Sequence, residues 1–206
     1  MAENHRIQLP ASEADITRLK VGDLVVLDGE ITTTAGLPTH HRIMEAIGGE
    51  RDLPFPLDGA ALCHLGSYSE DQSDGSFRIL YMNPTTSTRF NPLMPRIIRH
   101  FGLRIVMGKG GLDRECAKAM QDVGCVYLSI LGGGAPLHSD AIREVVDLGW
   151  DDLVAHYRLV RIRVEGLGPL TVGIDAHGNN GFLDRQEKAM GMIPELMAQM
   201  KATRGD

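Results

Sequence analysis

The chain lacks several features that would assign a protein to a class at once. It has three cysteines in 206 residues, and their spacing matches neither a CxxC pair nor a common zinc pattern. No apolar run approaches the ~20 residues that cross a bilayer, and "MAENHRIQLP" has no apolar core of a signal peptide. We therefore expect buried thiols in a reducing cytoplasm, no signal peptide and no membrane association.

Positive charge is also in short supply. The formal net charge is -6 at pH 7, so there is no excess positive field for general nucleic-acid binding, although a local cationic pocket is compatible with this balance. Hydrophobic residues make up 43% and charged residues 23%, which is ordinary for a soluble globular protein with a sizeable core. We expect a single domain over residues 1–206, with a C-terminal helical tail at 183–206.

Apolar runs and helical patterns alternate along the chain. Runs that predict strands lie in 24–31, 60–67, 77–82, 103–107 and 125–130, and helices are predicted at 40–47, 91–102, 112–124 and 137–150. Thr39 is the predicted N-cap of the first of these helices. The order of elements predicts an α/β fold with a mixed β-sheet and flanking helices.

Three further segments carry local predictions. The acidic segment 68–76 is expected to be an exposed loop or a mobile flap. A β-hairpin is expected from 157–164 and 169–176, which flank a glycine-containing turn. In the helical tail, we expect the methionines at 190, 192, 197 and 200 to pack against the protein.

Four polar clusters each follow a predicted strand. They are "TTTAGLPTHHR", "NPTTSTR", "GKGG" and "GGGAP". In α/β folds the carboxyl ends of parallel strands gather at one edge of the sheet, where ligands bind. The four turns are therefore expected to converge on one site.

Three cations lie in these turns: Arg42, Arg89 and Lys109. Arginine offers a planar fork that matches a carboxylate with two hydrogen bonds, whereas lysine offers a point charge. Three such groups near one another suit a small ligand with two carboxylates. The alternative for each one is a solvated surface charge.

A row of hydroxyls, Thr85, Thr86, Ser87 and Thr88, stands between Pro84 and Arg89. Such a row can bind an anion together with backbone N–H groups, or cap the following helix. One hydroxyl could act as a base or nucleophile if a nearby cation lowered its pKa. The residues alone do not choose among these roles.

The glycine and histidine motifs carry less chemistry. "MGKGGL" fails the P-loop pattern and "GGG" is not a dinucleotide fingerprint, so both indicate close approach of backbone to another group. His40 and His41 point in different directions on a helix, which disfavours a metal pair. One of them is a candidate hydrogen-bond partner for a substrate, and no metal-ligand set is expected in this chain.

Taken together, the motifs resemble one known family. "GEI…T…HHRI", "CHLGS", "NPTTSTRF", "MGKGGL" and "YLSILGGGAP", within about residues 20–180, are similar to the β subunit, or C-terminal domain, of iron–sulfur hydro-lyases of the class I fumarase and L(+)-tartrate dehydratase type. The most specific part is "PTTSTR" followed about twenty residues later by "GKGG". The resemblance implies a swivelling-type α/β domain.

The resemblance also implies a division of labour. A partner α subunit would hold a [4Fe–4S] cluster through its own cysteines, and this chain would form the other wall of the site, in an α2β2 assembly or with β–β contacts. Arg42, Arg89 and Lys109 would clamp the substrate carboxylates, with Thr86 also binding substrate. Thr85 would move the proton on carbon, with Lys109 and His40 in catalytic roles.

The sequence departs from the family pattern in places. Gly36 and Leu37 stand where an Arg-Asp pair is usual, and Asn83 replaces a glycine. The candidate substrates are fumarate or malate, tartrate, and mesaconate or citramalate. Two rival hypotheses remain: a non-catalytic anion-binding or regulatory module that uses the same turns, and a self-sufficient enzyme that uses His64 or Cys63.

Overall fold

The computed structural model describes residues 2–204 and confirms the α/β fold with a mixed sheet. The strands are β1 (Asn4–Gln8), β2 (Leu24–Thr34), β3 (Ala61–Asp71), β4 (Phe77–Pro84), β5 (Ile105–Gly108), β6 (Val126–Ser129), β7 (Ile142–Gly149) and β8 (Leu159–Ile174). The α-helices are α1 (Glu13–Thr17), α2 (Leu37–Ile47), α3 (Met94–Phe101), α4 (Arg114–Val123), α5 (Ala135–Ser139) and α6 (Gly181–Arg204), with short 3-10 helices at Ser87–Phe90 and Ala155–Tyr157.

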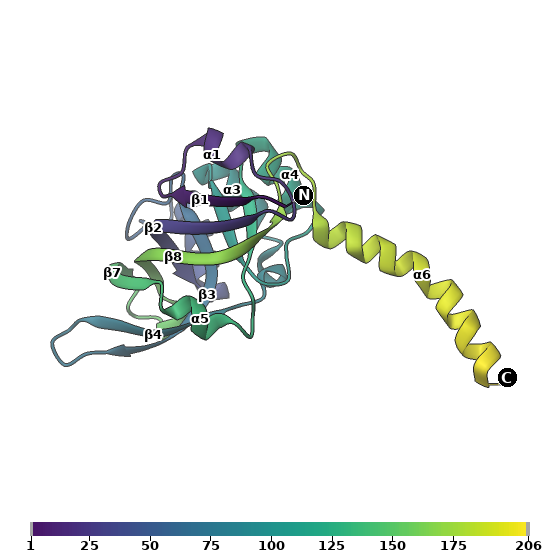
Figure 1. The fold of residues 1–206 in the computed structure, drawn as a ribbon. Coiled ribbons are helices and arrows are strands. Elements are labelled where there is room, and N and C mark those ends of the chain that lie inside the picture. Colours follow the sequence, from purple (N-terminus) through teal and green to yellow (C-terminus); the bar gives the residue numbers. More distant parts are fainter. Residues whose placement is uncertain (1, 205–206) are drawn as a thin grey trace.

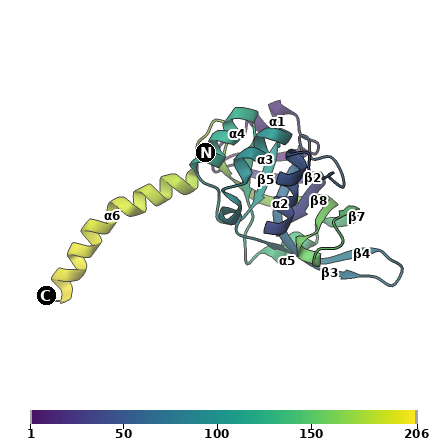
Figure 2. The same cartoon turned by 180° about the vertical axis from the view of Figure 1, so that it is seen from behind.

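Five of the strands close into a ring. β2, β3, β5 and β6 lie side by side and parallel, and the long strand β8 pairs antiparallel with β6 at one side and with β2 at the other. Helices α2, α3 and α4 connect the parallel strands and cover the outer face of the ring (Figure 2). The carboxyl ends of the parallel strands therefore lie at one edge, as the order of turns predicts.

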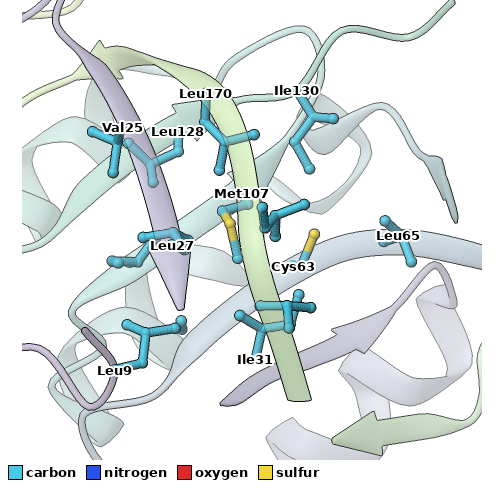
Figure 3. Packing of buried hydrophobic residues seen from close by; sticks show 14 of the residues in the cluster. Leu9, Val25, Leu27, Ile31, Cys63, Leu65, Met107, Leu128, Ile130 and Leu170 are labelled. Atoms are coloured by element: carbon cyan, nitrogen blue, oxygen red, sulfur yellow. The ribbon is translucent and has the colours of Figure 1, made fainter. Parts of the chain in front are cut away.

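The ring separates two hydrophobic cores, because successive residues of a strand point to opposite faces. Cys63, Met107 and Leu128 point into the ring together with Val25 and Leu170 of the closing strands (Figure 3). Their neighbours Leu62, Val106 and Tyr127 point outward and pack beneath the helices. Burying a large apolar side chain contributes roughly 1.5–3 kcal/mol, and strands that are buried on both faces explain the continuous apolar runs.

Helices α4 and α2 differ in how closely their ends follow local sequence signals. Helix α4 begins at Asp113, whose carboxylate accepts from the Cys116 N–H at 2.9 Å, and it ends at Gly124 in a left-handed conformation. Helix α2 begins earlier than predicted, with Gly36 as its N-cap. The predicted cap Thr39 was wrong, because its hydroxyl lies inside the helix and donates to the Tyr157 carbonyl.

Two predicted elements near the C-terminus were wrong. Residues 142–149 form strand β7 instead of continuing a helix, because pairing with β8 holds this β-branched segment extended. The expected hairpin at 157–176 is one strand, β8. Gly166 (φ +70) does not reverse the chain, and irregular register where β8 meets β2 lets the strand bend and continue.

Two segments extend away from the ring (Figure 1). The first is the β3–β4 hairpin. The loop predicted for 68–76 was wrong for residues 68–71, which pair with β4 as the end of β3, and residues 72–76 form the turn before the predicted strand at 77–82. The second is α6, whose Met190, Met192, Met197 and Met200 are about half exposed, so the expectation that they pack was wrong. Within residues 2–204, no helix is both long and apolar enough to cross a membrane.

Candidate functional site

A cavity of about 310 Å³ opens at the carboxyl edge of the parallel strands. Thr85 and Lys109 both line it, so the structure brings these two predicted site residues together. The remaining lining residues come from the end of β2, the β3–β4 hairpin and the short helix before β8: Ala35, Gly66, Ser67, Tyr68, Tyr81, Asn83, Pro84 and His156. The volume suits a small ligand.

Backbone hydrogen bonds hold Thr85 and Lys109 against each other. The Thr85 N–H donates to the His64 carbonyl at 2.8 Å, which extends the pairing of β4 with β3 by one residue. The Lys109 N–H then donates to the Thr85 carbonyl at 3.2 Å, and Thr86 and Lys109 form an isolated parallel bridge. The hydroxyl row thus crosses from the end of β3 to the end of β5 and places its first threonine beside the lysine.

Arg89 lies next to this pair. Its Nη1 is 3.5 Å from the Thr85 hydroxyl oxygen, a long contact that still directs positive charge at that oxygen. Arg89 is exposed and stands in the 3-10 helix Ser87–Phe90, for which Thr86 is the N-cap residue. The half-buried Thr86 side chain lies near the Gly110 turn, where a Cβ on that glycine would meet its methyl group at 3.4 Å.

The structure does not bring Arg42 into the cavity lining. Its guanidinium makes two hydrogen bonds with Asp152, at 2.7 and 2.5 Å, and lies over the Trp150 ring at 5.8 Å from the centroid. The exposed Asp152 carboxylate holds the arginine fork in the bidentate manner that a substrate carboxylate would use. That Arg42 clamps a substrate carboxylate stays a prediction, and it requires the substrate to replace Asp152 as the partner of the guanidinium.

His40 is buried behind the site instead of facing it. Its ring stacks on Phe90 at 3.9 Å with an interplanar angle of 8°, and His64 lies on the same aromatic cluster. The Nδ1–H of His40 donates to the Gly36 carbonyl at 2.7 Å. Burial lowers the pKa of His40 to about 4 and that of His64 well below its ordinary value, so both rings are neutral near pH 7.

The tyrosines of the cavity were missed in the sequence. Tyr68 of β3 and Tyr81 of β4 face each other across the hairpin and stack at 5.5 Å. Both are exposed, at 53% and 44%, which leaves an aromatic surface at the mouth of the cavity. Sequence reasoning missed them because it predicts a loop from Tyr68 onward, whereas the pairing of β3 with β4 is what brings the two rings together.

A larger hollow of about 650 Å³ lies elsewhere, over β1, β2 and β8. Its arginines already have carboxylate partners: Arg143 pairs with Glu165, Arg163 with Glu30, and Arg161 with Asp147. Because those charges are matched within the protein, this hollow offers less to an anion than the smaller cavity. We therefore take the smaller cavity as the candidate site.

Metal-binding side chains do not gather in the part of the chain that the structure describes. Residues 2–204 contain no group of three or more His, Cys, Asp or Glu side chains placed to hold a metal ion. The three cysteines are free and buried, as expected. Burial raises the pKa of each thiol, which opposes the thiolate form that ligates metals.

Comparison with known proteins places the chain among fumarase-related sequences. A putative L(+)-tartrate dehydratase subunit beta of Methanocaldococcus jannaschii is 32% identical over 187 residues, which are 90% of this chain and 95% of that protein. The L(+)-tartrate dehydratase subunit beta of Escherichia coli K12 is 30% identical over 171 residues, 83% of each chain. A putative class I fumarate hydratase of Geobacillus stearothermophilus is 31% identical over 190 residues, and this chain spans only 36% of its length.

The family model described as Fumarase C-terminus matches residues 1–185, a range that contains every residue of the candidate site. With that match and these relatives, the chain belongs to the Fumarase C-terminus family.

Proposed function

We propose that this chain is the β subunit of a hydro-lyase that reversibly adds water to, or removes it from, a small dicarboxylate of the fumarate, tartrate or mesaconate type. Thr85 moves the proton on carbon, and Lys109 and Arg89 bind and stabilise the carboxylates. The single observation that carries this proposal is the crossing of the hydroxyl row over the end of β5. It puts Thr85 and Lys109 in the lining of one cavity, with the Arg89 guanidinium beside the Thr85 hydroxyl.

The charges around Thr85 suit removal of a carbon-bound proton. Breaking that C–H bond next to a carboxylate leaves negative charge that spreads onto the carboxylate oxygens. A fixed ammonium group such as that of Lys109 stabilises this charge where it develops. A threonine hydroxyl is a weak base in water, and the nearby Arg89 guanidinium favours the form of Thr85 that has given up its own proton.

The remaining predicted residues take supporting roles in this proposal. Arg42 binds the second carboxylate once the exposed Asp152 is displaced from its fork. Thr86 contributes through the backbone bridge to Lys109. His40 acts through packing, because its ring is buried against Phe90 and is neutral.

The relatives bear on the partner of this chain. Two of them are named as β subunits of tartrate dehydratases. The other is named as a putative fumarate hydratase, and this chain covers only 36% of its length. We infer that a separate α subunit completes the site and holds the [4Fe–4S] cluster. The described residues of this chain do not fit a cluster, since its thiols are buried and do not gather into a metal-binding group.

The test is activity of a reconstituted pair. The chain is co-expressed with its candidate α subunit, purified without oxygen, and assayed for hydration of fumarate and mesaconate and for dehydration of tartrate. Thr85→Ala should lower kcat by about 10²–10⁴-fold, and Thr85→Ser, which keeps the hydroxyl, should retain far more activity. Thr88→Ala is the matched control, since Thr88 is an exposed hydroxyl three residues away.

Three outcomes count against the proposal. A pair that carries its cluster and acts on none of these diacids would contradict the assigned reaction. Wild-type activity in Thr85→Ala would contradict the assigned proton carrier. Failure to form any pair, combined with measurable diacid binding by the chain alone, would favour a non-catalytic anion-binding module.

A further inference from the structure

One side chain of the hydroxyl row does not face the cavity at all. Ser87 is fully buried, with 0% of its surface exposed. Its hydroxyl oxygen lies 2.9 Å from Nδ1 of His64 on β3 and 2.9 Å from the hydroxyl of Tyr127 on β6. Its backbone N–H donates to the carbonyl of Lys109 at 2.9 Å. A single serine therefore joins the ends of β3, β5 and β6 to the loop that carries Thr85.

Where the loop of Ser87 crosses the end of β5, the packing has no room for a side chain at position 108. A Cβ added to Gly108, the last residue of β5, would lie 2.2 Å from the Ser87 hydroxyl oxygen and 3.1 Å from the His64 Cβ. Real Cβ atoms do not approach other atoms so closely, so a glycine is needed there for the loop to rest on the strand. Lys109 follows directly, and its position depends on how the loop sits on Gly108.

The three bonded groups are also neutral and enclosed. Burial lowers the pKa of His64, and it raises the pKa of Tyr127 against the opposing effect of its hydrogen bond with Ser87. The Nε2 atom of His64 is buried and has no hydrogen-bond partner within residues 2–204. A chain of neutral hydrogen bonds in a buried interior is directional and costly to break, because a freed polar atom loses its protein partner.

We propose that Ser87, His64 and Tyr127 form a buried positioning triad that holds the Thr85 and Lys109 segments at a set separation. None of the three reaches the cavity lining, so the triad acts through the backbone and not on the substrate. This inference rests on the proposed function in assigning importance to the Thr85–Lys109 pair. It adds a separate claim, that the geometry of the pair is maintained from behind by a serine of the same motif.

The claim has a structural readout that needs no substrate. In amide hydrogen exchange on the full chain, Ser87→Ala should lower the protection of the Thr85 and Lys109 amides by at least about tenfold. Both amides are bonded across this crossing. Tyr127→Phe keeps the ring and removes one hydrogen bond, so it should give a smaller loss. Thr88→Ala removes an exposed hydroxyl of the same loop and should leave both amides unchanged.

The kinetic readout separates positioning from other roles. In the active pair, Ser87→Ala should lower kcat by about 10–100-fold, because small misplacements of reacting groups carry penalties of that size. KM should change less than threefold, and the shape of the pH profile should stay the same. A shifted pH profile would overturn the inference in favour of direct proton transfer through His64, and an unchanged kcat would overturn it as well.

The two proposals fail in different ways. Unchanged protection of Thr85 and Lys109 in Ser87→Ala overturns the triad, whatever the activity assay shows. A wild-type pair that is inactive on every diacid overturns the proposed function, while the exchange data still decide the triad. If Ser87→Ala does not fold, Tyr127→Phe, which preserves packing, provides the same comparison.

Discussion

The glycine turn after β5 allows a sharp test of the packing behind the site. Gly111 has φ +76, and a Cβ added there would lie 2.5 Å from Cδ2 of Phe182. Gly111→Ala therefore has two costs. The left-handed backbone costs an alanine about 1–2 kcal/mol, and pushing the ring about 1 Å aside costs about 1–3 kcal/mol more. Gly49 offers a matched control, since it has φ +77 but nothing within 4 Å of its added Cβ.

The measurement is the free energy of unfolding from urea titrations of the two variants and the wild-type chain. Gly111→Ala should be less stable than Gly49→Ala by about 1–3 kcal/mol. In a Phe182→Ala background that difference should largely vanish, because the ring is gone and only the backbone cost remains. Equal costs for the two glycine variants, or an unchanged cost without the ring, would refute the packing argument.

Three further results are expected. Because burial lowers the pKa of His40 from 6.5 to about 4, the unfolded chain binds that proton first. The stability contribution of neutral His40 is fully present above pH 6.5 and is lost, by roughly 3 kcal/mol, as the pH falls from 6.5 to 4. His64 acts in the same direction, so His40→Gln should reduce, without abolishing, the fall of the urea midpoint over this window, and an unaltered slope would contradict the prediction. Removing residues 188–206, of which 188–203 are exposed residues of α6, should lower Tm by less than about 2 °C, and a loss above 5 °C would show that the tail packs. Thiol reagents should modify the cysteines only after unfolding, because all are buried: Cys63, Cys116 and Cys125.

The fold class and the sequence of strands and helices between residues 24 and 130 were predictable, because their signals are local. Buried strand β5 begins with the apolar run 105–107 and leads into a glycine turn, and β2 contains the apolar run 24–27 and ends in a row of threonines. The region after residue 136 was not predictable in the same way. Strand β7 is held extended by its pairing with β8, and β8 remains one strand because it has partners on both sides. Those partners are distant in the sequence.

The candidate site was also predictable only in part. Lys109 lies at this edge because it follows the parallel strand β5. Thr85 follows β4 instead, which is antiparallel to β3 and returns to the same edge through the hairpin. The tyrosine pair of the cavity depends on the register that places Tyr68 opposite Tyr81, and a short acidic segment does not disclose its register. The partner of Arg42 is also set by tertiary structure, since Asp152 lies 110 residues away.

By itself, the sequence determined the chemical inventory of this protein: a hydroxyl row closed by Arg89, a lysine in a glycine turn, and an acidic chain without a cysteine set for a metal. Only the tertiary structure decided which of these groups work together. Two residues of one loop, separated only by Thr86, have opposite surroundings: Thr85 lines a cavity, whereas Ser87 is buried between His64 and Tyr127. The physical reason is that the side chains of a crossing loop point to both of its faces, and the strands beneath determine which face is solvent and which is core.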